Sequence, residues 1–174
     1  GFYGDHIVIG HGAQGGWDKL GPERTITRAE GNVLYELDGR PALAVYAEYL
    51  GERARDLPSA GVAFPIAVRA PATAERATAR RVLAVDPQAH SIAAAGAVPA
   101  GGRCQLLKAD PDHLVDAATA VVGAATTTQP AGDTSLTIAV SCIGRRLVLG
   151  DRVGEELEGV RAALPAAGAQ LIGF

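Results

Sequence analysis

The sequence predicts an α/β protein in which early antiparallel hairpins join a late parallel βαβ portion in a mixed sheet with helices packed on it. Short β-rich runs separated by glycine, asparagine and proline turns fill the first half of the chain. Strand-like and helix-like patterns then alternate over the last seventy residues, which favours parallel strands joined by right-handed crossovers. At 174 residues, 48% of them hydrophobic, the chain is long enough for a packed core.

The first forty residues are expected to form strands and turns. An apolar run at 6–9 predicts a short strand. Runs at 25–28 and 33–37 flank a turn at 29–32 that contains glycine and asparagine, which predicts a hairpin. A helix follows from Pro41 to Gly51, because proline suits a first helical turn and glycine suits a helix end, and Glu48 is expected to point outward.

The middle of the chain predicts a second group of strands. Residues 62–68 are strand-like, but Pro65 cannot donate a ladder hydrogen bond and therefore belongs at an edge or at a strand start. Residues 70–79 predict a loop. The runs 81–85 and 91–94 predict a hairpin around 86–90, and 104–108 predicts a further strand.

The last third predicts alternating helices and strands. Residues 110–112 resemble a helix N-terminus and precede an apolar stripe that continues to Ala125. A polar loop at 126–133 leads to a buried strand at 136–140. A second helical stripe runs from Leu149 to Leu164 and is stopped by Pro165, and 169–174 predicts a final strand.

Composition excludes several classes of protein. No apolar run reaches 18 residues and no signal-peptide pattern opens the chain. A net charge of −3 with mixed signs argues against a nucleic-acid surface. Two cysteines form neither a disulfide framework nor a zinc-ligand set, which is typical of the cytoplasm. Because the chain opens without methionine and stops at Phe174 within an apolar run, we expect one compact piece of a longer protein.

Residues 10–15 match the dinucleotide-binding pattern G-x-G-x-x-G, and Glu30 follows at the spacing of a ribose-binding acid. The pattern binds a pyrophosphate only where its last glycine opens a helix. Residues 16–22 predict no helix, so a glycine-dependent tight loop is the favoured interpretation.

The segment 141–146 is the richest in chemistry. Cys142 is expected at the carboxyl end of a strand just before a helix, where open α/β sheets form ligand crevices, with Arg145 and Arg146 beside it. Val148 stands where a phosphatase-type loop needs arginine. A structural cysteine, a ligand-pocket residue and a reactive thiol remain three interpretations of Cys142.

The other ionisable residues give weaker signals. The four histidines show no zinc-ligand spacing, although one axial histidine suffices for a haem, and His11 near Trp17 is the best placed. The acidic residues of the last helix accompany arginines at helical spacing, as Glu156 does with Arg152, which predicts a solvated helix face.

The order of several segments resembles the FIST sensory domain of intracellular signal transduction proteins. The residues that carry the resemblance are 15–17, 25–28, 31–43, Tyr46, 49–51, 64–65, 141–146 and 149–150, of which 31–51 is the most specific stretch. The resemblance implies that 1–40 is the β-rich end of the FIST N-terminal half and that 41–174 is a FIST C-terminal-type α/β part. By this resemblance, most of the N-terminal half, the stretch that usually follows Phe174 and an output domain are expected to lie outside these 174 residues.

The resemblance implies a bacterial, cytoplasmic module that binds small ligands, with amino acids as the suggested class. Its partners would be an output domain or a protein such as a kinase or cyclase. No nucleic acid or membrane span is expected, and exposed strand edges allow homo-oligomers. One branch of the family is similar to haem-based nitric oxide sensors, so haem is the alternative to a protein without a cofactor. A thiol enzyme centred on Cys142 is the alternative to a protein without catalytic residues.

The expected binding site gathers residues from both ends of the chain, and no metal ligands are expected. An arginine would pair with a ligand carboxylate in two-point fashion, while a tryptophan would cover an apolar or cationic part. The expected ligand-binding residues are Cys142, Arg145 and Arg146, with Trp17, Gly12 and Gly15 on the opposing side.

Overall fold

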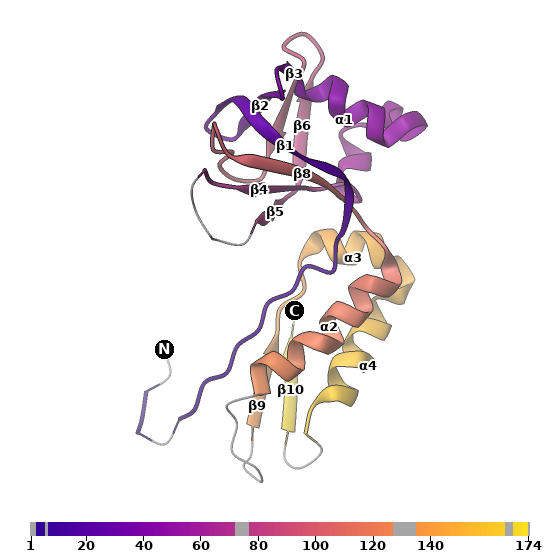
Figure 1. The fold of residues 1–174 in the computed structure, drawn as a ribbon. Helices are drawn as coiled ribbons and strands as arrows, with labels where there is room; N and C mark the ends of the chain where they lie inside the picture. The colour runs from indigo at the N-terminus through magenta and orange to yellow at the C-terminus, as the bar shows by residue number, and fades with distance from the viewer. Residues whose placement is uncertain (1–2, 6, 72–76, 127–134, 166–168, 174) are drawn as a thin grey trace. The chain divides into compact units, whose positions relative to one another are not determined.

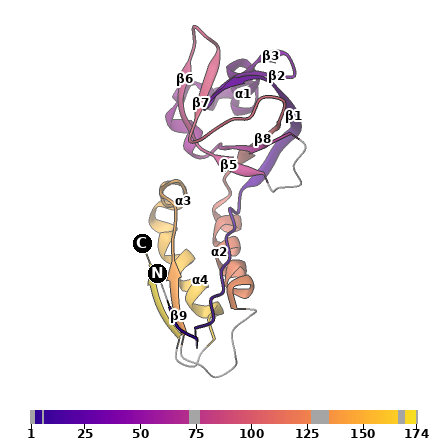
Figure 2. The same ribbon diagram turned by 90° about the vertical axis from the view of Figure 1, so that its left-hand side faces the viewer.

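The computed structural model describes residues 3–5, 7–71, 77–126, 135–165 and 169–173. Contacts within the chain divide it into two compact units (Figures 1 and 2). Unit 1 consists of Gly1–Gly16 and Asp110–Phe174, and unit 2 consists of Trp17–Ala109. Unit 1 is therefore discontinuous in sequence, and each unit is described by itself.

Unit 2 is built on a curled antiparallel sheet. Its strands are β1 (Asp18–Glu30), β2 (Val33–Leu37), β3 (Arg40–Pro41), β4 (Ile66–Arg69), β5 (Thr78–Arg80), β6 (Val82–Asp86), β7 (Ser91–Ala94) and β8 (Arg103–Lys108). The strand order is β5-β4-β8-β1-β2-β7-β6, with β3 paired to β2. Neighbouring strands in this order are all antiparallel.

One face of this sheet packs against helix α1 (Ala42–Leu50), which is followed by 3-10 turns at Gly51–Asp56 and Ser59–Val62. Tyr46 of α1 is fully buried, and its hydroxyl donates a 2.5 Å hydrogen bond to the carbonyl of Phe64. Burial raises the pKa of Tyr46. Apolar residues from α1, β1, β2, β4, β7 and β8 form the core, among them Ile26, Leu34, Val45, Ile66, Ile92 and Leu106.

Unit 1 contains the parallel portion. Its elements are α2 (Pro111–Thr126), β9 (Ser135–Ala139), α3 (Ile143–Leu149), a 3-10 turn (Gly150–Arg152), α4 (Val153–Ala163) and β10 (Ala169–Gly173). Strands β9 and β10 pair in parallel, with Ile138 opposite Ile172. A small core joins α2 and α4 through Ala118, Val122 and Val160, and Leu171 of β10 packs against it.

The predicted mixed α/β class is confirmed. The hairpins at β1–β2 and β6–β7 are present, α1 ends at Gly51 with φ +59°, and Pro65 directly precedes β4. Helix α2 begins as predicted after Asp110, whose carboxylate accepts from the amide of Asp112 at 3.0 Å. The loop predicted at 126–133 lies almost wholly outside the described residues, as does the middle of the loop predicted at 70–79; the end of that second loop was predicted wrongly, because Thr78 and Ala79 belong to β5, which pairs with β4.

Three predictions about the sheets were wrong. The antiparallel and parallel strands lie in two separate sheets, because the chain leaves β8 directly into α2, and β9 pairs with β10. Residues 7–9 belong to no strand and are exposed. Leu136 and Ile138 of β9 are 54% and 48% exposed rather than buried, since the helices that pack on this sheet contact it through its other face.

The predicted single helix from Leu149 to Leu164 was also wrong. It is divided by Gly150, whose φ of +55° is a left-handed conformation that ends α3. A short 3-10 turn then leads into α4. None of the described helices is long and apolar enough to cross a membrane.

Candidate functional site

The three residues that the sequence singled out lie where β9 is followed by α3, with Cys142 just before the helix and Arg145 and Arg146 within it. Cys142 is the N-cap of α3, and its exposed sulfur accepts a hydrogen bond from the backbone amide of Arg145 at 3.4 Å. Arg146 is exposed to solvent on the first turns of α3. The predicted position of Cys142 at the start of a helix is therefore present.

Arg145 is 7% exposed, and its guanidinium is directed into unit 1. Nε donates to Oε1 of Glu156 at 2.7 Å, and Nη2 lies 2.5 Å from the same oxygen. Nη1 donates to the carbonyl of Gly15 at 2.7 Å, and Nη2 donates to the carbonyl of Leu114 at 2.5 Å. These contacts tie the start of the chain, α2 and α4 to α3, so Arg145 has a structural role in this geometry.

The sequence placed Glu156 on a solvated helix face beside Arg152, and this was wrong. Glu156 is 5% exposed and also accepts from the hydroxyl of Ser141 at 2.9 Å. Arg152 pairs instead with Glu155 and with Asp112, both at 2.7 Å. The four-residue spacing along α4 therefore did not predict the ion pairs, because Glu156 lies on the side of α4 that faces Arg145 of α3.

The glycines near the start of the chain allow it to lie against α2. A Cβ added at Gly12 would lie 2.7 Å from the side chain of Val121, and one added at Gly16 would lie 2.8 Å from Ala117. Gly15 contributes its carbonyl to Arg145. No helix begins after this segment, in agreement with the exclusion of dinucleotide binding, and the next element is β1.

The other predicted residues are placed as follows. Trp17 is half-buried and belongs to unit 2, whereas Cys142, Arg145, Arg146, Gly12 and Gly15 belong to unit 1. His11, in unit 1, is exposed, as are His90 and His113, while His6 lies outside the described residues. Within unit 1 the structure brings Gly15, Cys142 and Arg145 together.

Unit 2 contains a shallow groove that the sequence did not indicate. It has a volume of about 230 Å³ and is lined by Val33, Tyr35, Ala84, Val85, Asp86, Ala89, Ser91 and Ala93. These residues come from three neighbouring strands, β2, β7 and β6, and from the turn that joins β6 to β7. Val33 and Tyr35 alternate with Leu34, which is in the core, so the groove lies on the opposite face of the sheet.

Charged groups stand on both flanks of this groove. The guanidinium of Arg28 on β1 lies over the ring of Tyr35, 4.5 Å from its centroid, and its Nε donates to Glu36 at 3.0 Å. Asp86 stands at the end of β6, where Oδ1 accepts from the amides of Gln88 and Ala89 at 2.8 and 3.0 Å. The groove therefore combines an apolar floor with a cation on one side and a carboxylate on the other.

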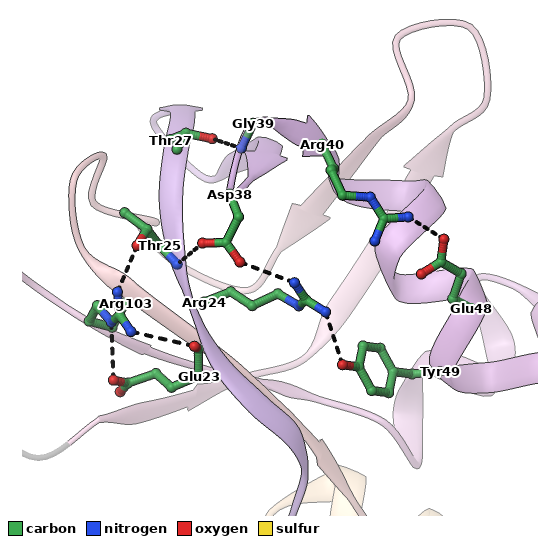
Figure 3. Close-up of polar contacts among 10 residues, drawn as sticks. All are labelled: Glu23, Arg24, Thr25, Thr27, Asp38, Gly39, Arg40, Glu48, Tyr49 and Arg103. Atoms are coloured by element: carbon green, nitrogen blue, oxygen red, sulfur yellow. Dashed lines mark hydrogen bonds and ion pairs between the residues drawn. The ribbon is translucent and has the colours of Figure 1, made fainter.

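A separate polar network stabilises the curled part of β1 (Figure 3). Arg24 donates to Asp38 and to the hydroxyl of Tyr49, both at 3.0 Å. Asp38 has φ +51° and also accepts from the amide of Thr25 at 2.8 Å. The Thr25 amide, followed by Arg24, lowers the pKa of Asp38. This network fixes the turn after β2 against β1 and α1.

A second ion cluster forms around Glu23, the residue that precedes Arg24 in β1. Glu23 accepts from Arg69 and from Arg103, each at 3.1 Å. These hydrogen bonds, that of Arg69 first, lower the pKa of Glu23. Each arginine forms an ion pair with Glu23, and the three residues come from β1, β8 and β4. The cluster therefore stabilises the pairing of these three strands.

The described elements define a mixed α/β fold with a curled antiparallel unit and a unit in which helices pack on one face of a parallel sheet. The chain belongs to the FIST family: the FIST N domain matches residues 1–40 and the FIST C domain matches residues 42–174. FIST domains are sensory domains of signal transduction proteins, and this chain is therefore a sensory domain of that family. No curated protein and no solved structure gives a significant match.

Proposed function

We propose that this sensory domain detects a small ligand in the groove of unit 2, and that the ligand is an amino acid. The observation that carries the proposal is the combination of Arg28, Tyr35 and Asp86 around one apolar floor. Sites for drug-sized ligands occupy about 300–1,000 Å³, so the smaller groove suits a ligand of amino-acid size. A guanidinium and a carboxylate complement the two charges of an amino acid.

The separation of the two charged groups favours a long amino acid. Strands β2 and β7 lie between the strands of Arg28 and Asp86. Neighbouring strands are about 4.8 Å apart, and Arg28 already reaches over Tyr35, so roughly 10 Å separates the guanidinium from the carboxylate. A lysine-like ligand would place its carboxylate near Arg28 and its terminal ammonium near Asp86. Signalling would follow from different affinities for two conformations of the domain.

Calorimetry of the chain against the twenty amino acids tests this proposal. We expect binding to be strongest for a long basic amino acid and to weaken at least about tenfold in Asp86→Asn, since an ion pair is lost. Arg146→Ala, at an exposed position of α3 in unit 1, is the matched control and should bind as the parent does. The absence of binding by every amino acid would refute the ligand class. Loss of binding in Arg146→Ala but not in Asp86→Asn would move the site to the turn at Cys142.

A further inference from the structure

One face of the parallel sheet in unit 1 is uncovered. Leu136, Ile138 and Ile172 are 54%, 48% and 53% exposed. Ile138 and Ile172 are directly opposite each other in the parallel register, and Leu136 lies two residues before Ile138, so the three side chains project from the same face. Leu171 projects from the other face and packs against the core formed by α2 and α4.

This arrangement is unusual for a parallel sheet. Parallel strands occur almost only in sheets whose two faces are both covered, and two strands alone are marginally stable in water. In the part of the chain that the structure describes, helices cover one face of β9 and β10. The exposed face therefore carries three large aliphatic side chains, as an interior surface does, beside the polar Gln170.

Further exposed apolar residues follow β9 along the chain. Val140 follows Ile138 by two residues and is 68% exposed, and Ile143 and Leu147, one helical turn apart on α3, are 61% and 58% exposed. Of the large hydrophobic residues that are exposed among those described, Leu83 alone belongs to unit 2. We define the apolar surface of unit 1 as Leu136, Ile138, Val140, Ile143, Leu147 and Ile172.

We propose that the apolar surface of unit 1 packs against the same surface of a second copy of this chain. The first argument is charge. Neither β9 (SLTIA) nor β10 (AQLIG) contains an ionisable side chain or a proline. Exposed edges and faces are normally protected by such residues, and their absence from both strands lets the sheet faces of two copies meet without repulsion.

The second argument is area. With roughly 100 Å² of exposed surface on each of its six side chains, the surface offers about 600 Å² per copy, or about 1,200 Å² for the pair, which reaches the lower end of specific, stable interfaces. A two-fold arrangement uses the same surface twice and closes after two copies. A dimer is therefore the expected assembly.

Sedimentation velocity over a wide range of concentration tests the proposal. We expect the chain to sediment as a dimer. Ile138→Asp and Ile172→Asp should raise the dissociation constant more than about 100-fold, because each would bury an unpaired carboxylate. Leu83→Asp is the matched control, since Leu83 is 44% exposed in unit 2, and this variant should remain dimeric.

Hydrogen exchange of the unaltered chain gives a measurement that does not depend on whether the variants fold. Protection of β9 and β10 should rise with protein concentration, while that of β6 and β7 should stay constant. The proposal would be overturned if the chain stayed monomeric at every concentration, or if Leu83→Asp and Ile138→Asp dissociated equally. It would also be overturned if a monomer used this face to bind a different protein.

Discussion

Replacing Glu156 by glutamine tests the role assigned to the buried ion pair in unit 1. Glu156 and Arg145 are 5% and 7% exposed, and Arg145 also holds the carbonyls of Gly15 and Leu114. Glu156→Gln keeps the shape and one acceptor but removes the charge that balances the guanidinium. Breaking a buried pair in this way costs about 3–5 kcal/mol, because the remaining charge stays buried without a counter-ion.

The assay is amide hydrogen exchange followed peptide by peptide, which measures the local free energy of opening in each unit. A loss of about 3 kcal/mol corresponds to exchange roughly 100-fold faster in α2 and α4. The peptides of unit 2 should exchange as before, because Arg145 and Glu156 both belong to unit 1.

The matched control is Glu155→Gln on the same helix. Glu155 pairs with Arg152 at the surface, where water and salt screen the charges. This variant should exchange like the parent chain. If Glu156→Gln accelerates exchange less than about tenfold, or no more than Glu155→Gln does, the ion pair does not hold unit 1 together.

Three further predictions concern other parts of the chain. Gly16→Ala should destabilise unit 1 by more than about 1 kcal/mol, because its Cβ would contact Ala117 and its φ is +70°, while Gly31→Ala, with φ +57° and open space, should cost less in thermal unfolding. Iodoacetamide should label exposed Cys142 long before Cys104, as mass spectrometry of the peptides would show; equal rates would contradict the burial of Cys104. Burial raises the pKa of Cys104 to about 12, whereas the thiol of the unfolded chain has a pKa of about 8.5. The neutral thiol therefore contributes its full free energy of stabilisation below about pH 8.5, and this contribution decreases as the pH rises from there toward 12. Denaturant titrations of unit 2 at increasing alkaline pH should show that decrease, and a constant stability would contradict it.

Local patterns in the sequence predicted most of the elements. The Gly31–Asn32 turn, the proline and glycine that bound α1 and the acidic N-terminus of α2 are each determined by residues within a few positions. The sheets could not be predicted in this way, because strand pairing depends on residues far apart in the chain. Alternating apolar residues in β9 looked like a buried strand, although the structure covers only one of its faces.

The partners of the candidate site residues also could not be predicted from positions close in the sequence. Spacing along α4 assigned Glu156 to Arg152, since four residues separate them, whereas α3 supplies the buried partner Arg145. The groove was missed because its lining comes from β2, β6 and β7. The outward alternation of Tyr35 with Leu34 was the local signal that could have indicated it.

The discontinuity of unit 1 affects how the chain is made. During synthesis Gly15 leaves the ribosome before unit 2, whereas Arg145, which donates to its carbonyl, emerges only after the whole of unit 2. Unit 2 is continuous and can fold once Ala109 has left the exit tunnel, because domains generally fold as units during translation. The segment before β1 can pack only after α2 and α3 have been made, so a nascent chain halted near residue 109 would carry a folded antiparallel sheet and an undocked segment around Gly12 and Gly15.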